Sequence, residues 1–131
     1  MGSINWQEKL HFSIEQLDEI RNAGYAYIRQ GKYNIALPLF EALAILDPQN
    51  AYDLLTVGAL YLQMNRPELA IKKLEQALAI EKDSAAAKIN LAKAYVACEK
   101  VDQALAIAKT LKNNPDPFIS SHADALLLAY K

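Results

Sequence analysis

The sequence predicts an all-α protein: a solenoid of three helical hairpins with a short N-terminal helical extension and a C-terminal capping helix. Glycine is scarce, at four of 131 residues, and β-branched runs are missing, so intrinsic propensity favours helix. The chain also repeats itself at an offset of 34 residues. Two series share this frame: Tyr27, Tyr61 and Tyr95, and Ala36, Ala70 and Ala104. Because each hairpin completes its apolar face against the next, three in a row bury one continuous core.

The repeat frame divides a single domain, residues 1–131, into five parts. These are an extension at 3–12, repeats at 17–50, 51–84 and 85–116, and a capping helix at 117–131. A third series, Gly24, Gly58 and Ala92, falls in the middle of the first helix of each hairpin. A small residue there lets the second helix approach closely, so this series predicts tight pairing within each hairpin.

The first hairpin has local signals at both ends of its first helix. Ser13 and Gln16 form a capping box that predicts a helix over 14–29, and Gly31 ends it. The second helix is predicted over 33–46 and contains Pro38.

Proline removes one backbone hydrogen bond, which Pro38 would have donated to Asn34. We therefore expect the helix at 33–46 to bend near Asn34 or to begin late.

Capping residues place the later helices. Asn50 caps the third helix, Asn65 and Glu68 form a second capping box around a proline, and Asp83 or Ser84 caps the fifth helix. The remaining helices are predicted over 51–64, from the Asn65 cap to 81, from the Asp83 or Ser84 cap to 98, and over 101–112 and 117–130.

Charge and hydropathy exclude two classes of partner. The formal charge of -1 provides no basic field, so nucleic acid is not expected as a partner. Apolar stretches such as 57–62 are far shorter than the roughly 18 residues of a membrane span, so no membrane insertion is expected. Residues 1–13 have no apolar signal region, and we expect a cytoplasmic protein.

The sequence offers little for catalysis. Cys98 is the single cysteine, and His11 and His122 lie near opposite ends of the chain. No motif brings a nucleophile, a base or metal ligands together. We therefore predict no enzyme, no cofactor and no metal.

A binding surface is the remaining functional feature. In this architecture the first helices of the hairpins line the inside of the curve. The predicted peptide-binding groove comprises Arg21, Tyr25, Ile28, Arg29, Tyr52, Leu55, Ala59, Leu62, Gln63, Ile89, Lys93 and Val96. Its apolar strip should anchor a client segment that the three cations orient. The alternative is that some of these residues pack against neighbouring helices or are covered by the N-terminal segment.

The periodic tyrosines, alanines and small residues resemble the tetratricopeptide repeat (TPR) family from Leu17 to about Asp116. Some members grip acidic C-terminal tails with a clamp of Lys, Arg and Asn. This chain has Arg21 and Asn90, but Tyr25, Thr56 and Ala86 occupy other clamp positions. The resemblance therefore implies protein binding without that clamp.

One bacterial subfamily is more similar. The segments GKY at 31–33, FEAL at 40–43, LDPQN at 46–50 and GA at 58–59 resemble the class II chaperones of type III secretion. That resemblance implies a bacterial cytoplasmic chaperone that holds a segment of a secreted translocator in its concave groove. A chaperone of the secretion needle subunit, which binds a helical segment, and a general TPR adaptor remain alternatives.

The two ends of the chain also offer apolar residues for association. Trp6 and Leu10 are one helical turn apart near the N-terminus, and a row of leucines lies at 126–128 near the C-terminus. A homodimer through the N-terminal or C-terminal helix is therefore a further expectation.

Overall fold

The computed structural model describes residues 12–130, and within this range the regular structure is entirely helical. The helices are α2 (Ile14–Arg29), α3 (Tyr33–Leu46), α4 (Ala51–Gln63), α5 (Pro67–Ile80), α6 (Ala85–Ala97), α7 (Val101–Leu111) and α8 (Pro117–Ala129). All seven helices lie close to their predicted ranges, which confirms the all-α fold. The extension predicted at 3–12 lies outside the described residues except for Phe12. No helix in the described range is long and apolar enough to cross a membrane.

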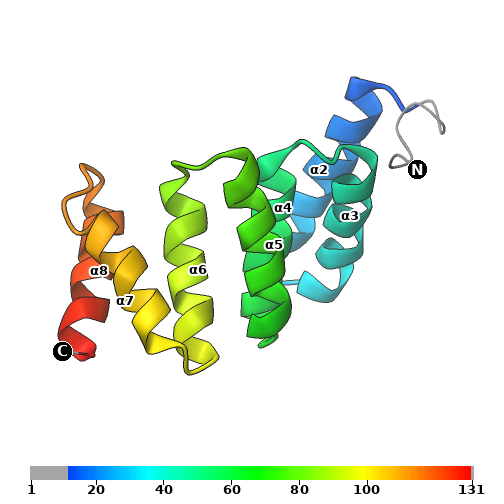
Figure 1. Ribbon diagram of the computed structural model, residues 1–131. Coiled ribbons are helices and arrows are strands. Elements are labelled where there is room, and N and C mark those ends of the chain that lie inside the picture. The colour runs from blue at the N-terminus through cyan, green and yellow to red at the C-terminus, as the bar shows by residue number, and fades with distance from the viewer. Residues whose placement is uncertain (1–11, 131) are drawn as a thin grey trace, which may run out of the picture.

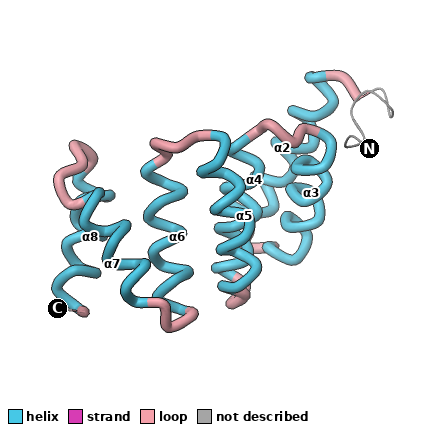
Figure 2. Tube along the Cα trace, viewed as in Figure 1, coloured by secondary structure: helices cyan, strands magenta, loops and turns pink. Residues whose placement is uncertain are grey.

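Consecutive helices stand side by side in chain order from the α2 end to the α8 end (Figure 1). Short loops connect them (Figure 2). We call α2, α4 and α6 the A helices and α3, α5 and α7 the B helices. α4 contacts α6 directly, and α8 packs against both α6 and α7. The arrangement is the predicted solenoid of three hairpins with a capping helix.

Side-chain caps begin three of the helices as predicted. The Ser13 hydroxyl accepts from the Gln16 amide at 3.1 Å, and the Gln16 side chain accepts from the Ser13 amide at 2.9 Å. Asn50 caps α4, and Ser84 caps α6. These short-range bonds satisfy N–H groups that have no partner within the helix.

The capping box predicted at Asn65 and Glu68 is wrong. Arg66 is the residue before α5, and no side chain caps that helix. Asn65 instead adopts a left-handed conformation with φ 61°, and the Arg66 amide donates to the Tyr61 carbonyl at 2.8 Å. Asn65 therefore ends α4 rather than beginning α5, because this type of helix end needs a residue at positive φ.

The same turn ends all three A helices. Gly31 has φ 73° and Glu99 has φ 61°, each 34 residues from Asn65. The following amides, of Lys32 and Lys100, donate to the carbonyls of Tyr27 and Tyr95 at 2.9 and 2.8 Å. The repeat frame thus extends from the core to the backbone of the turns.

Pro38 lies within α3, which nevertheless begins at Tyr33, so the expected late start is wrong. Both Pro38 and Asn34 are exposed. Water can therefore hydrate the Asn34 carbonyl that loses its backbone donor, and the helix tolerates the proline. The bend near Asn34 stays a prediction.

Tight packing within the hairpins explains the small-residue series. A Cβ atom added to Gly24 would lie 2.4 Å from the ring of Phe40, and one added to Gly58 would lie 2.6 Å from Cγ of Leu74. In the third repeat Ala92 and Ala108 occupy the equivalent positions, and both are fully buried. In the third repeat the A-helix residue is therefore larger than in the first two, alanine in place of glycine. The B-helix residue is smaller, alanine in place of phenylalanine or leucine.

Candidate peptide-binding groove

A groove of about 370 Å³ lies on the face formed by the A helices, which we call the A-helix face. Its lining comes from the end of α2, the start of α3, α4 from Leu55 onward and the middle of α6. The lining residues are Ile28, Tyr33, Leu55, Thr56, Ala59, Leu60, Gln63 and Asn90. This central groove brings together four of the predicted residues: Ile28, Leu55, Ala59 and Gln63.

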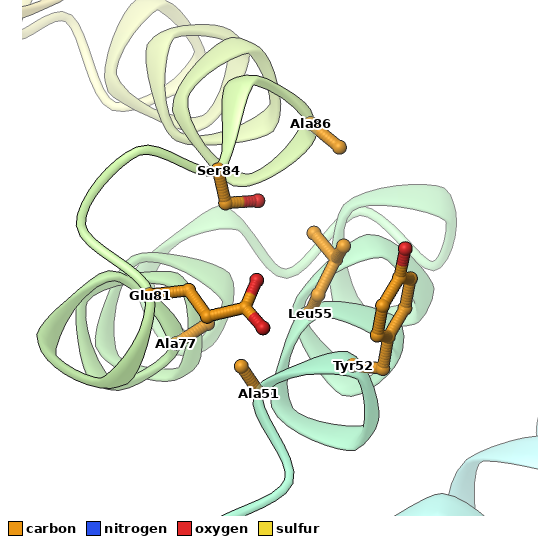
Figure 3. Close-up of a pocket in the computed structure, with 7 residues that line it drawn as sticks. All are labelled: Ala51, Tyr52, Leu55, Ala77, Glu81, Ser84 and Ala86. Atoms are coloured by element: carbon orange, nitrogen blue, oxygen red, sulfur yellow. The ribbon is translucent and has the colours of Figure 1, made fainter.

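A second, smaller hollow of about 50 Å³ lies between the start of α4, the end of α5 and the start of α6 (Figure 3). We call it the side hollow. It is lined by Ala51, Tyr52, Leu55, Ala77, Glu81, Ser84 and Ala86. Leu55 lines both cavities, so the side hollow adjoins the central groove. The side chain of Tyr52, 66% exposed as a residue, forms one wall of it.

Arg21 has a different role from the predicted one. Its Nε donates to Oδ1 of Asp53 at 2.8 Å, and its Nη2 donates to Oδ2 of Asp53 at 2.7 Å. Nη2 also lies 2.6 Å from Asp47, and Nη1 lies 2.9 Å from Asp18. Three carboxylates of this chain already hold the guanidinium, so Arg21 joins structural elements of the chain and is not the free groove cation that was predicted.

The Arg21 network joins the first two repeats. The Asp53 side chain is 0% exposed and lies on α4, whereas Asp47 lies in the turn between α3 and α4. The Arg21 side chain is 14% exposed. Hydrogen bonding to Asp53 raises the pKa of Arg21 despite the opposing effect of desolvation. The network therefore keeps a buried carboxylate paired at the junction of the two hairpins.

Ile89 is also not a groove residue, because it is only 2% exposed. It belongs to a buried cluster with Leu111 of α7 and Ile119 and Ala123 of α8. The capping helix thus covers the part of α6 that was predicted to be open.

The other predicted residues keep some exposure. Tyr25 packs its ring 5.0 Å from that of Phe40, so it is half-buried against the core. Leu62 is half-buried against the same core cluster, and Val96 of α6 is half-buried. Arg29 and Lys93 are exposed. The open apolar strip is therefore shorter than predicted and centres on α4.

Several lining residues were missing from the predicted groove. Thr56 and Asn90 are 34 positions apart, and the sequence analysis placed both at clamp positions without including them in the predicted groove. Glu81 and Ser84 reach the side hollow from the connection between α5 and α6. Periodicity along a helix gives no signal for such loop residues.

The site's chemistry suits binding. Cys98 is half-buried, and desolvation, followed by the nearby Glu68 carboxylate, raises the pKa of its thiol, which disfavours the thiolate. Among residues 12–130, no group of three or more His, Cys, Asp or Glu residues could hold a metal ion. The central groove instead offers aliphatic and aromatic side chains with Thr56, Gln63 and Asn90 as polar groups. Such a lining can desolvate apolar side chains of a bound segment.

A helical-repeat solenoid with an apolar groove on its inner helices defines a class of protein-binding modules. The sequence-family model of the tetratricopeptide repeat matches residues 61–127, just over half of the 131 residues. The chain belongs to the tetratricopeptide repeat family. A curated relative, Superkiller protein 3 of Schizosaccharomyces pombe, is 30% identical over 98 residues, or 75% of this chain. The chain spans only 7% of that relative's length.

Solved structures share the whole arrangement. The type III secretion translocator chaperone SycD of Yersinia enterocolitica matches with a TM-score of 0.82 and 20% identity, covering 98% of this chain and 99% of SycD. SycD in complex with a peptide of the translocator YopD matches with a TM-score of 0.78 and 20% identity, covering 91% and 98%. The first TPR of RPAP3 bound to an HSP90 peptide gives a TM-score of 0.80 and 20% identity, covering 92% and 97%. At these identities the likeness shows the fold.

Proposed function

We propose that this protein is a chaperone of the bacterial cytoplasm that binds an apolar segment of a secreted client, a type III secretion translocator, in its central groove. The observation that carries the proposal is the convergence of Ile28, Leu55 and Ala59 on one groove of the A-helix face. Apolar side chains in a central groove contribute most to binding a peptide segment. Bound there, the client segment would be shielded from aggregation and premature insertion.

The structural comparisons support this choice of client. SycD, which has the same helix arrangement along nearly its whole length, is a translocator chaperone. The exposed side chains of Arg29 and Lys93 are available to interact with acidic groups of the client. Needle-subunit clients and a general adaptor role are outcomes that the experiment below separates.

The C-terminal end gives the adaptor role some support. Phe118 and Leu128 of α8 are 59% and 70% exposed, which leaves apolar surface for a second protein or a second copy of this chain. An alternative dimer of SycD shares the fold, with a TM-score of 0.78 and 21% identity. Dimerisation of this protein through α8 stays a prediction, and the N-terminal option at Trp6 and Leu10 lies outside the described residues.

The test begins with co-purification of the protein from its native cells and identification of the bound client. Affinity for that client is then measured with two variants, Ala59→Arg in the central groove and Tyr52→Ala in the adjoining side hollow. Ala59 lines the central groove and is half-buried, so arginine there introduces a charge and fills the groove. We expect Ala59→Arg to weaken binding by about tenfold or more. Leu62→Arg is less suitable, because Leu62 packs against the core.

The matched control is Ala42→Arg, the same substitution at an exposed position of α3. Circular dichroism should show that all variants fold. If Ala59→Arg and Tyr52→Ala both bind the client normally and changes on the B helices weaken it, the groove proposal is wrong and the adaptor role replaces it.

A further inference from the structure

The junction between the second and third repeats lacks the charged network of the first. The network residues Asp18, Arg21, Asp47 and Asp53, moved by 34 positions, become Tyr52, Leu55, Glu81 and Ala87. Three of these four equivalents, all but Ala87, line the side hollow. The side hollow is therefore the counterpart of the place where the first junction holds the Arg21 side chain.

Two of these replacements are smaller and remove the buried ion pair from the second junction, whereas Tyr52 and Glu81 are larger than Asp18 and Asp47. Leu55 is shorter than Arg21 and carries no guanidinium, and Ala87 replaces the buried Asp53. The carboxylate is retained, since Glu81 corresponds to Asp47, whose oxygen lies 2.6 Å from Arg21 in the first junction. In Figure 3 the carboxylate of Glu81 points into the hollow, with Leu55 between it and Tyr52.

We propose that the side hollow receives the side chain of a lysine or arginine from the bound client segment. The inference rests on the proposed function, because it assumes that a segment lies in the adjoining central groove. It adds a charge requirement to the client: a basic residue close to the apolar residue that fills the groove.

The chemistry of the side hollow suits a long basic side chain. The methylene groups of lysine or arginine can pack on Leu55 and the ring of Tyr52, while the charged end reaches Glu81. Glu81 directly follows α5 (Pro67–Ile80), so the partial negative charge at that helix end adds to the attraction. One carboxylate at an exposed position holds a cation less firmly than the three around Arg21.

The geometry of α4 sets the spacing within the client. The α4 residues of the side hollow centre near Tyr52, and those of the central groove centre near Ala59. Six or seven helical residues span roughly 10 Å, which an extended segment covers in about three residues. The basic residue should therefore lie about three positions from the apolar anchor.

The first experiment uses a random dodecapeptide library displayed on phage and selected against the full-length protein. We expect enrichment of peptides with lysine or arginine two to four residues from a leucine, isoleucine, valine or phenylalanine. The best peptide is then synthesised with a fluorescent label in two forms, with lysine or with uncharged norleucine at the basic position. Fluorescence anisotropy gives the dissociation constants.

Two protein variants test whether the preference for the lysine peptide comes from the side hollow. We expect the lysine peptide to bind about three- to fivefold more tightly than the norleucine peptide to the unaltered protein, with a larger ratio at low salt. Glu81→Gln should reduce the ratio to about one. Glu68→Gln, at an exposed glutamate in the first turn of α5, the helix that Glu81 follows, should leave the ratio unchanged.

The possible outcomes separate the two proposals. Peptides that bind without preferring lysine, but that Ala59→Arg weakens, would overturn this inference and leave the proposed function intact. A lysine preference that persists in Glu81→Gln would also overturn it. Failure to select any peptide that Ala59→Arg weakens would count against both.

Discussion

Gly58 and Leu74 show how single residues set the distance between two paired helices. Leu74 fills the space that a side chain on Gly58 would need, and a Cβ there would lie 2.6 Å from Cγ of Leu74. Ala92 and Ala108 are the equivalents one repeat later, and both are fully buried. In the second hairpin a leucine of the B helix fills the space between the two helices, whereas in the third hairpin each helix contributes an alanine.

Substitutions that copy the third repeat into the second should therefore be coupled. We expect Gly58→Ala alone to lower the free energy of unfolding by about 1 to 3 kcal/mol through overpacking, and Leu74→Ala alone by about 2 to 5 kcal/mol through a cavity. The double variant should lose at least about 1 kcal/mol less than the sum. Urea denaturation of the four proteins measures this coupling, and strictly additive losses would contradict the packing account.

The turns that end the A helices also repeat every 34 residues. The turns after α2, α4 and α6 place Gly31, Asn65 and Glu99 at positive φ, and each turn closes with a bond to a periodic tyrosine carbonyl. Glycine and asparagine adopt this conformation readily, whereas a glutamate does so at a cost of about 1 to 2 kcal/mol. The third turn is therefore the most strained of the three.

Glu99→Gly should relieve this strain. We expect the free energy of unfolding to rise by about 0.5 to 1 kcal/mol, since the greater freedom of glycine in the unfolded chain offsets part of the gain. Glu99→Ala is the control, because it removes the charge and retains the side-chain clash. Thermal and urea denaturation distinguish the two, and an equal gain from both substitutions would point to charge instead of backbone conformation.

Helix boundaries were predictable because their signals are local. The caps at Ser13 and Asn50 need only residues within one turn, and both were found from the sequence. Asn65 was misassigned because asparagine serves equally well as a helix cap and as a left-handed residue. The equivalent positions Gly31 and Glu99 show which role applies, but only the backbone reveals that the three share a conformation.

Across the whole molecule, the two junctions between repeats are chemically different. The first depends on the Arg21 guanidinium between Asp47 and the fully buried Asp53, whereas the second has Leu55 and Ala87 at the positions of Arg21 and Asp53. Removing one member of a buried ion pair costs more than the pair contributes, because the other charge is left without a partner.

Arg21→Leu should therefore destabilise the protein by about 3 kcal/mol or more. Adding Asp53→Ala, which copies Leu55 and Ala87 of the second junction, should restore much of the loss, since no buried charge is then unpaired. Arg29→Leu, at an exposed arginine on the same helix, should change stability by no more than about 0.5 kcal/mol. Urea midpoints test the series, and a double variant as unstable as Arg21→Leu would refute the explanation.

The groove residues were only partly predictable from the sequence, because some of them depend on contacts with remote parts of the chain. The repeat frame identified the inward positions of α4, including Leu55 and Ala59, because they depend on helix periodicity alone. Arg21 is paired with Asp47 and Asp53, and Ile89 is covered by α8. These partners are distant in sequence from the residues that they contact. A pattern within one helix cannot show which remote side chain will occupy or cover it.

The complementary pair at Gly58 and Leu74 also limits how such a sequence can diverge. For this hairpin to acquire the alanine pair of the third repeat, both Gly58 and Leu74 must change to alanine. Whichever position changes first, the protein passes through an intermediate with one substitution. One intermediate is overpacked and the other has a cavity, at about 1 to 5 kcal/mol against a total stability of roughly 5 to 15 kcal/mol. Because the overpacked intermediate is the less costly of the two, divergence between repeats favours the change of glycine to alanine before the change of leucine to alanine.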